Sequence, residues 1–184
     1  MDRTKTILAA AVIIGGVIFA SLVYMFLTPA EKRPVGVPLT NREMVREPVH
    51  LYFADRNNTH LTAEQRLLPR TEDPGVLAKL IVEALISGPE TGLIRTLPET
   101  GIVKAVFITP NGTAFVDLDE SIRNDHPGGS RTELLTVYSI VNSVVLNISE
   151  VDSVKVLING KEADTLAGHI SLKAPLQANM LMVR

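Results

Sequence analysis

The chain has 184 residues, a length that suits one domain with a single core. Its formal net charge is −2 and its lysines and arginines are scattered, so no basic stripe is available to neutralise a row of phosphates, and we expect no nucleic-acid partner. The absence of cysteine excludes disulfides, thiolate metal sites, a cysteine nucleophile and a lipid-modified cysteine anchor.

The first element expected along the chain is a membrane span. Residues 7–27, ILAAAVIIGGVIFASLVYMFL, contain no charged side chain. As a helix they would span roughly 30 Å, the thickness of the hydrocarbon core of a bilayer. We therefore predict a transmembrane helix over 7–27 that leaves residues 1–6 in the cytoplasm. A cleaved signal peptide is the alternative, but the apolar run exceeds the usual length of about 7 to 15 residues, and no convincing A-x-A cleavage site follows it.

The charges around this segment do not decide its orientation. Arg3 and Lys5 precede it, while further lysines and arginines follow it among several glutamates. Residues 28–47 mix prolines with charged residues and show no sustained apolar period. This composition predicts an extended linker ahead of a folded domain over 48–184.

The domain is expected to begin with a hairpin and a helix. Residues 49–55 alternate apolar and polar side chains, the period of a half-buried strand, and a turn at RNN leads to a returning strand within 61–70. A helix should follow, with Asp73 as its N-cap and Pro74 at its first position. Gly88 should end it, because glycine accepts the left-handed conformation of a helix terminus and a proline follows.

The loop 88–101 is rich in glycine, proline and threonine, a composition that also occurs in anion-binding loops. It lies at the carboxyl end of the expected helix, where unpaired carbonyl groups carry partial negative charge. A phosphate would be repelled there. We therefore interpret this loop as the end of the helix and not as an anion site.

Two further hairpins and a second helix are expected after this loop. Asn111-Gly112 and Asn159-Gly160 each separate two β-rich runs, a strong signal for a tight turn. The order hairpin, helix, hairpin, helix, hairpin predicts an α+β fold in which antiparallel β-hairpins alternate with two long helices, preceded by one transmembrane helix.

The second long helix is expected over about 131–149. Ser130 and Glu133 have the spacing of a capping box at its start. Leu135 and Leu146 lie off its main apolar stripe, so the helix should be covered on more than one side.

The sequence contains no motif that demands catalysis or a metal. Its four histidines are isolated, without H-x-x-x-H or H-E-x-x-H spacing, and there is no G-x-S-x-G elbow. Residues 117–129 begin like a calcium loop, but Ile122 stands where the loop needs glycine and Gly128 stands where it needs glutamate. We therefore expect no catalytic residue, no metal ligand and no cofactor.

Two weaker options stay open. The run PGGS before the second helix could offer free amides to an anion, although Ser130 and Glu133 would compete for them. A hydrolase acting through Asp117, Asp119 or Asp125 is also not ruled out, because spacing in the sequence does not give spacing in the fold.

A resemblance to a known family rests on a series of segments: LYFAD, LTAEQRLLP, LIVEALISGPETGLIRTLP, GIVKAVFI, GTAFVDLDESI, ELLTVYSIVNSVV, VDSVKVLINGKE and LAGHISLKAPL. In this order, they resemble the GerMN domain of the sporulation and spore germination family. The likeness runs from residue 48 to about 177, in a single copy. It implies an extracytoplasmic, membrane-tethered accessory domain of α+β fold that has no known catalytic centre and acts in multiprotein assemblies at the cell envelope. Many relatives carry a lipobox cysteine, so here the spanning helix would replace the lipid.

We therefore expect a non-enzymatic scaffold domain that mediates protein–protein interactions in a cell-envelope assembly. The expected location is the cytoplasmic (inner) membrane, single-pass, with the C-terminal domain outside the cytoplasm. Its partners would be envelope proteins and, through residues 7–27, the membrane. Further copies of the chain are an additional expected partner, in a homo-oligomer. A sensor domain that binds cell-wall material or a small ligand is the alternative. Four residues are expected to alternate away from the core and are therefore candidates for partner binding: Tyr52, Arg56, Arg123 and His126.

Overall fold

A long antiparallel hairpin opens the domain in the computed structural model, which describes Tyr24 and residues 45–184. Strand β1 (Arg46–Ala54) pairs with β2 (Leu61–Pro69) over their full lengths. The apolar residues of β1 at alternate positions lie in the core, as the period-two pattern predicts, and two of them, Leu51 and Phe53, are fully buried.

Helix α2 (Pro74–Ser87) follows the hairpin and begins and ends where the sequence predicts. The Asp73 carboxylate accepts the backbone N–H of Gly75 at 2.8 Å, which satisfies one of the free amides of the first turn. Gly88 ends the helix with φ of 91°, a conformation that favours glycine. The predicted cap and stop are both confirmed.

The second sheet has the strand order β3-β4-β5-β6. Its strands are β3 (Val103–Ile108), β4 (Thr113–Leu118), β5 (Ser153–Ile158) and β6 (Lys161–Glu162). The pairs β3–β4 and β5–β6 are antiparallel hairpins, as expected, but β4 and β5 are parallel. A parallel pair needs a crossover of a dozen or more residues, and helix α4 (Ser130–Val145), with a short helix α3 (Ser121–Asn124) before it, supplies this connection.

The expected fold class is therefore wrong in two respects, and the observed fold is a mixed α+β fold. The hairpins do not simply alternate with helices as independent antiparallel units, because β4 and β5 join two of them into one mixed sheet. Within Tyr24 and residues 45–184, no helix has the length and apolar character needed to cross a membrane. The helix expected over 7–27 lies, apart from Tyr24, outside the described residues, as do residues 1–6 and most of the linker.

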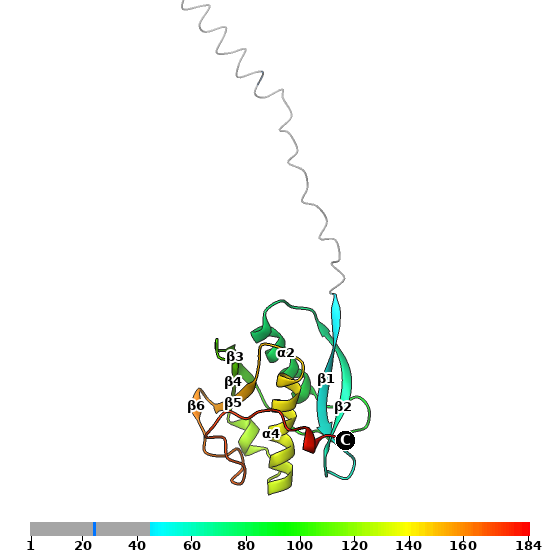
Figure 1. Cartoon of the computed structure of the whole chain (residues 1–184), viewed down its shortest axis with the longest axis vertical. Helices are drawn as coiled ribbons and strands as arrows, with labels where there is room; N and C mark the ends of the chain where they lie inside the picture. Colours follow the sequence, from blue (N-terminus) through cyan, green and yellow to red (C-terminus); the bar gives the residue numbers. More distant parts are fainter. Residues whose placement is uncertain (1–23, 25–44) are drawn as a thin grey trace, which may run out of the picture. The chain divides into compact units, whose positions relative to one another are not determined.

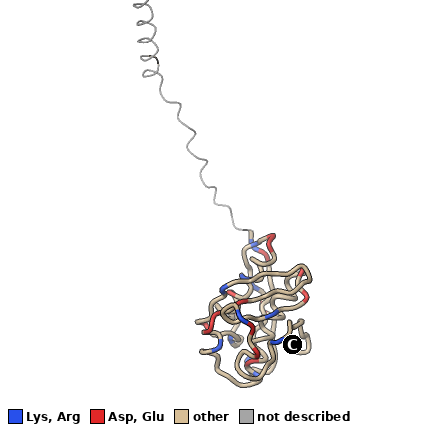
Figure 2. Tube along the Cα trace, turned by 90° about the vertical axis from the view of Figure 1, so that its left-hand side faces the viewer, with Lys and Arg blue, Asp and Glu red and all other residues tan. Residues whose placement is uncertain are grey.

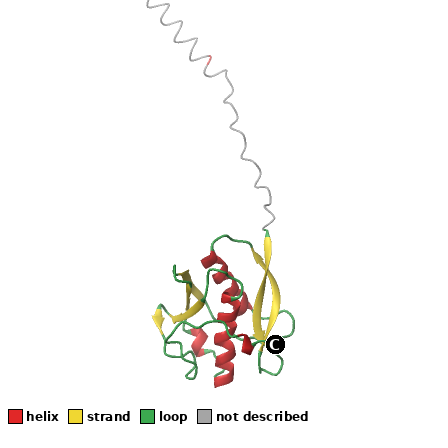
Figure 3. Ribbon diagram, viewed as in Figure 1, coloured by secondary structure: helices red, strands yellow, loops and turns green. Residues whose placement is uncertain are grey.

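Helices α2 and α4 lie between the two sheets (Figures 1 and 3). Helix α4 is covered on several sides, as predicted, and its buried residues include polar ones such as Ser139, Asn142 and Ser143. The expected capping box is wrong: Gly129 is the N-cap, without a side-chain hydrogen bond. Glu133 instead turns towards a loop far along the chain.

The polar face of α4 satisfies the free edge of β1. The Ser139 hydroxyl donates to the carbonyl of Tyr52 at 2.6 Å, and the Ser143 hydroxyl accepts the backbone N–H of Tyr52 at 3.0 Å. One turn further along, the Asn147 side chain exchanges hydrogen bonds with the backbone N–H and carbonyl of His50, at 2.9 and 2.7 Å. Helix side chains thus take the place of a third strand, which fixes the position of α4 against the hairpin.

Candidate functional site

The most buried carboxylate of the domain, that of Glu133, holds a C-terminal loop. Its Oε1 accepts the backbone N–H groups of Leu166 and Ala167 at 3.0 and 2.7 Å. Its Oε2 accepts the backbone N–H of His169 at 2.8 Å. Burial by itself would raise the pKa of Glu133, but the hydrogen bonds from Ala167, Ile170 and His169 outweigh burial and lower the pKa.

Glu64 of β2 does the same for the loop 88–101. Its side chain is buried and accepts the backbone N–H groups of Glu90 and Thr91, at 3.0 and 2.8 Å, together with the Thr91 hydroxyl and the Arg66 guanidinium. Burial would raise the pKa of Glu64, but these hydrogen bonds lower it. The loop is thus held by a carboxylate, in agreement with its interpretation as a structural segment.

Asp55 closes the turn between β1 and β2. It accepts the backbone N–H groups of Asn57, Thr59 and His60 at 3.1, 2.6 and 2.9 Å. The hydrogen bond from His60, with those from Thr59 and Asn57, lowers the pKa of Asp55 well below its ordinary value despite an opposing effect of burial.

The three aspartates considered for hydrolysis hold two segments: Asp117 holds the turn after β5, and Asp119 and Asp125 hold residues 100–102. Asp117 accepts the backbone N–H of Gly160 at 2.6 Å, and Asp125 accepts the hydroxyl of Thr100 at 2.5 Å. Asp119 accepts the backbone N–H of Ile102 at 2.8 Å. In the part of the chain that is described, no group of three or more His, Asp or Glu side chains could hold a metal ion. Each of these three carboxylates is therefore engaged in a hydrogen bond that holds a neighbouring segment of the domain.

Tyr52, one of the four predicted partner-binding residues, lies in the interior. Only 8% of it is exposed, and it belongs to a small apolar cluster with Ala54, Leu61 and Leu135. The alternation rule placed it outwards, but this face of the hairpin is covered by α4 and the C-terminal segment. Burial raises the pKa of the Tyr52 hydroxyl.

The other three predicted residues lie in surface segments. Arg56 is exposed in the turn after β1. Arg123 of α3 is also exposed, and its Nε donates to the carbonyl of Leu166 at 3.1 Å. His126 is half-buried and lies 3.0 Å from the Thr136 hydroxyl through its Nε2. Their role in partner binding stays a prediction.

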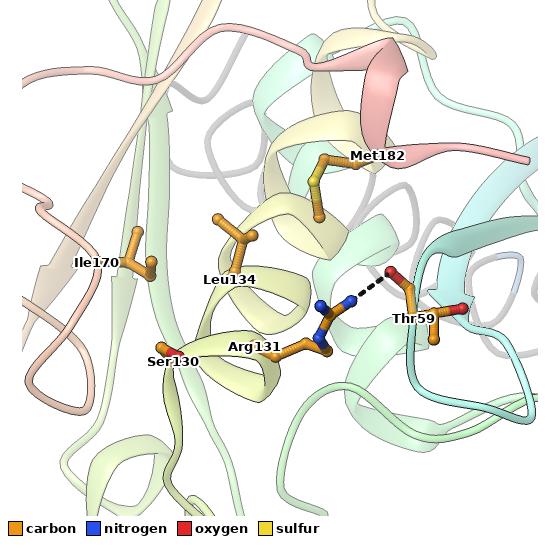
Figure 4. Close-up of a pocket in the computed structure, with 6 residues that line it drawn as sticks. All are labelled: Thr59, Ser130, Arg131, Leu134, Ile170 and Met182. Carbon is orange, nitrogen blue, oxygen red and sulfur yellow. Dashed lines mark hydrogen bonds between the residues drawn. The ribbon is translucent and has the colours of Figure 1, made fainter.

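A surface hollow of about 290 Å³ lies at the start of α4 (Figure 4). It is formed by the turn after β1, the first turns of α4 and the C-terminal segment. Its lining residues are Thr59, Ser130, Arg131, Leu134, Ile170 and Met182. Figure 4 shows the apolar side chains of Leu134, Ile170 and Met182 on one side and the Arg131 guanidinium beside Thr59.

Arg131 is fixed at the rim of this hollow, because its Nη1 donates to the carbonyl of Thr59 at 3.2 Å. The hollow thus combines an apolar wall with one positive charge. The sequence gives no local signal for this hollow, because Leu134 has the spacing of a core-facing helix residue but is only half-buried, and no local pattern places Met182 beside it.

A second, polar hollow of about 500 Å³ lies between α3 and the turn after β5. Side chains of both charges line it, including those of Glu120, Arg123, Lys161 and Asp164. Figure 2 shows acidic and basic residues scattered over the rest of the domain as well.

The chain is similar to known proteins in sequence and in fold. The family model Germane, described as sporulation and spore germination, matches residues 50–164. The tandem GerMN domains of the sporulation protein GerM from Bacillus subtilis are 26% identical and cover 73% of this chain, with a TM-score of 0.58. This chain covers 46% of that tandem structure, so it spans about half of its length.

Two further solved structures are similar to the chain. The first GerMN domain of the same Bacillus subtilis protein is 26% identical, with a TM-score of 0.57, and the match covers 72% of this chain and 96% of that one. A Clostridium perfringens protein described as a lipoprotein is 19% identical, with a TM-score of 0.52 and coverage of 76% and 92%, and it shares the fold alone. None of the curated proteins compared with the chain matches it.

Proposed function

Because the chain belongs to the Germane family of sporulation and spore germination, we propose that its domain is a non-catalytic accessory domain that binds other proteins of a cell-envelope assembly. The observation that carries this proposal is the use of the buried carboxylates. Glu64 and Glu133 each accept several backbone amides of a distant loop. Carboxylates committed in this way hold the surface rigid and have little capacity left for acid–base chemistry.

The hollow at the start of α4 is the surface that we assign to a protein partner. Its apolar wall of Leu134, Ile170 and Met182 suits a partner's apolar side chain, and Arg131 at the rim suits an acidic neighbour of that side chain. The carbonyl of Thr59 already orients the guanidinium, so little side-chain entropy is lost on binding.

Photo-cross-linking in cells tests this assignment. A photo-reactive residue at position 134, in the full chain at native expression, should capture a specific envelope protein. Arg131→Glu should reduce that capture several-fold, because it reverses the charge at the rim. The matched control carries the photo-reactive residue at position 76 instead, because Val76 is 46% exposed on α2. Equal capture from positions 134 and 76, or capture unaffected by Arg131→Glu, would refute the assignment.

We also propose that the domain lies outside the cytoplasm, as the family resemblance implies. Protease added to intact cells whose outer layers have been permeabilised should then degrade residues 45–184, whereas a cytoplasmic marker protein should survive. Protection of the domain until the cytoplasmic membrane is lysed would contradict this location.

A second candidate function is binding of a cell-wall fragment or another small polar ligand. The polar hollow favours it, because its volume of about 500 Å³ and its mixed charges suit a ligand that carries both amino and carboxylate groups. Peptidoglycan fragments titrated into the protein should then shift the NMR signals of Arg123 and Lys161. Unchanged signals at millimolar fragment would remove this candidate.

A further inference from the structure

The pairing register of the first hairpin shows which backbone groups of β2 point away from β1. The backbone N–H of Asp55 donates to the carbonyl of His60 at 2.9 Å. At the other end of the hairpin, the backbone N–H of Arg70 donates to the carbonyl of Val45 at 2.8 Å. Odd-numbered residues of β1 and even-numbered residues of β2 therefore face each other, and the odd-numbered residues of β2 point outwards.

The outward groups of β2 form an open edge. Within the described residues, no hydrogen bond uses the backbone groups of Ala63, Gln65 or Leu67 that point away from β1. The edge is closed at one end, where the carbonyl of Leu61 accepts the backbone N–H of Arg184 at 2.9 Å. At the other end, Pro69 has no N–H but offers its carbonyl.

The long strand edges elsewhere in the described domain are covered or guarded. Side chains of α4 satisfy β1 at Tyr52, and Asn147 just after the helix satisfies it at His50. Strand β3 carries Lys104 and lies against α2, while β5 exchanges two backbone hydrogen bonds of 2.8 Å with Leu176. The edge of β2 has no charged residue among its outward positions, and Leu67 there is 55% exposed. Natural proteins usually protect such an edge unless it pairs.

We propose that β2 pairs with β2 of a second copy of this chain, antiparallel and centred on Leu67. The two hairpins then form one four-stranded sheet across a two-fold axis, in which the same surface is used on both copies. Leu67 of each copy exchanges two backbone hydrogen bonds with the other, and each Gln65 N–H donates to the carbonyl of Pro69 in the second copy. About four backbone hydrogen bonds join the two copies.

Two neighbouring registers are less favourable. Pairing centred on Arg66 would place the two arginines directly opposite each other, and pairing centred on Gln65 would meet the C-terminal residue. Pairing centred on Gln65 would place Pro69 of the second copy opposite Leu61, whose outward carbonyl already accepts from Arg184. Pairing centred on Leu67 moves the second strand clear of Arg184. It uses the outward N–H of Gln65, both outward groups of Leu67 and the outward carbonyl of Pro69, and leaves only the outward carbonyl of Gln65 unpaired.

The side chains also suit self-pairing about Leu67. The two exposed leucines meet at the axis, and Pro48, which lies opposite Leu67 in the hairpin and is also exposed, extends the apolar contact. Glu64 of one copy lies opposite Arg70 of the other, so no like charges face each other across the junction. The contact is small, and the association therefore depends on protein concentration.

Cysteine cross-linking of the full chain in cells tests this pairing, because the natural sequence contains no cysteine. In the proposed register the two Leu67 Cα atoms lie roughly 5.5 Å apart. This separation falls within the range of about 4.4 to 6.8 Å for disulfides. Leu67→Cys should therefore give a disulfide-linked dimer on mild oxidation. Ile102→Cys, at a site of similar apolar character and 59% exposure, is the control for random collision.

A proline variant tests whether the backbone hydrogen bonds form. Gln65→Pro removes an N–H that no partner within the described residues uses, so the hairpin should keep its melting temperature. Combined with Leu67→Cys, it should lower the dimer yield several-fold. A yield no higher than that of Ile102→Cys, a yield unchanged by Gln65→Pro, or a disulfide to a different protein would each overturn self-pairing. These outcomes are independent of capture from position 134, so failure here leaves the proposed function testable by itself.

Discussion

Glu133 and His169 are joined twice through one carboxylate oxygen: Oε2 of Glu133 accepts the backbone N–H of His169 at 2.8 Å and lies 3.0 Å from Nδ1 of its ring. The carboxylate is fully buried, whereas the imidazole is 46% exposed. This contact ties the first turn of α4 to the loop that carries Ile170 to the hollow. The shape of the hollow therefore depends on one buried charge.

Glu133→Gln should destabilise the domain by about 2 kcal/mol, because hydrogen bonds to a charged group are lost and the amide NH₂ must face backbone donors. Urea unfolding followed by circular dichroism measures this loss. Glu83→Gln on α2 is the control, since the Glu83 side chain is 47% exposed and its ion pair with Lys79 is at the surface. A loss for Glu133→Gln no larger than that for Glu83→Gln would show that the buried contact contributes little.

The lowered pKa values of Glu64 and Glu133 predict loss of stability in acid. Both groups start from an ordinary value of 4.5, and in the folded domain they hold protons less tightly than in the unfolded chain. Their contribution is fully present above pH 4.5 and is lost as the pH falls through the lower folded values. The free energy of unfolding, measured between pH 7 and pH 3, should decrease below about 4.5, and this decrease should be smaller in Glu133→Gln.

His126 should titrate below its ordinary value of 6.5, because burial disfavours its charged form while the negative charge of Glu133 partly opposes this effect. Its Nδ1 also accepts the backbone N–H of Gly128 at 2.9 Å, a hydrogen bond that protonation would break. Stability from this contact is lost as the pH falls below 6.5. NMR titration should show a pKa below 6.5 and a further decrease in Glu133→Gln. An unchanged or raised pKa in that variant would contradict the predicted coupling.

The capping box expected at Ser130 and Glu133 shows where local patterns mislead. Asp73 and Gly88 were predicted correctly because their partners lie within the same helix and its immediate neighbours. The spacing of Ser130 and Glu133 is equally local, but Glu133 accepts amides more than thirty residues away. Nothing in the short-range sequence identifies those amides as a better partner than the start of the helix.

The same limit explains the parallel pair β4–β5. Each hairpin has its own turn signal, so β3–β4 and β5–β6 could be predicted, but whether two hairpins share a sheet depends on how α4 crosses between them. The burial of Tyr52 has a related cause. Its strand alternates correctly, yet the C-terminal segment and α4 cover the second face, so alternation no longer means exposure.

Gly88→Ala should destabilise the domain by more than Gly128→Ala, although both glycines have positive φ, of 91° and 80°. Backbone strain costs each variant about 1 to 3 kcal/mol. At Gly88 a new Cβ would also lie 2.8 Å from Cζ of Arg95, whereas nothing lies within 4 Å at Gly128. The guanidinium donates to the carbonyls of Ile86 and Ser87, so displacing it also removes a cap from α2. Thermal melts compare the two variants, and equal losses would show that the Arg95 contact is unimportant.

Ser139→Ala tests the replacement of a third strand by helix side chains. The variant leaves the carbonyl of Tyr52 without the donor that now lies 2.6 Å away, and this carbonyl is buried between α4 and β1. An unsatisfied buried acceptor costs about 1 to 3 kcal/mol, so the free energy of unfolding should fall by that amount. Ser149→Ala, an exposed serine whose hydroxyl contacts only Glu150, should change it by less than about 0.5 kcal/mol. Hydrogen exchange in Ser139→Ala should accelerate at Tyr52 before it accelerates in the mixed sheet. The reason is that β1 depends on α4 for its outer hydrogen bonds, whereas β4 and β5 pair with each other.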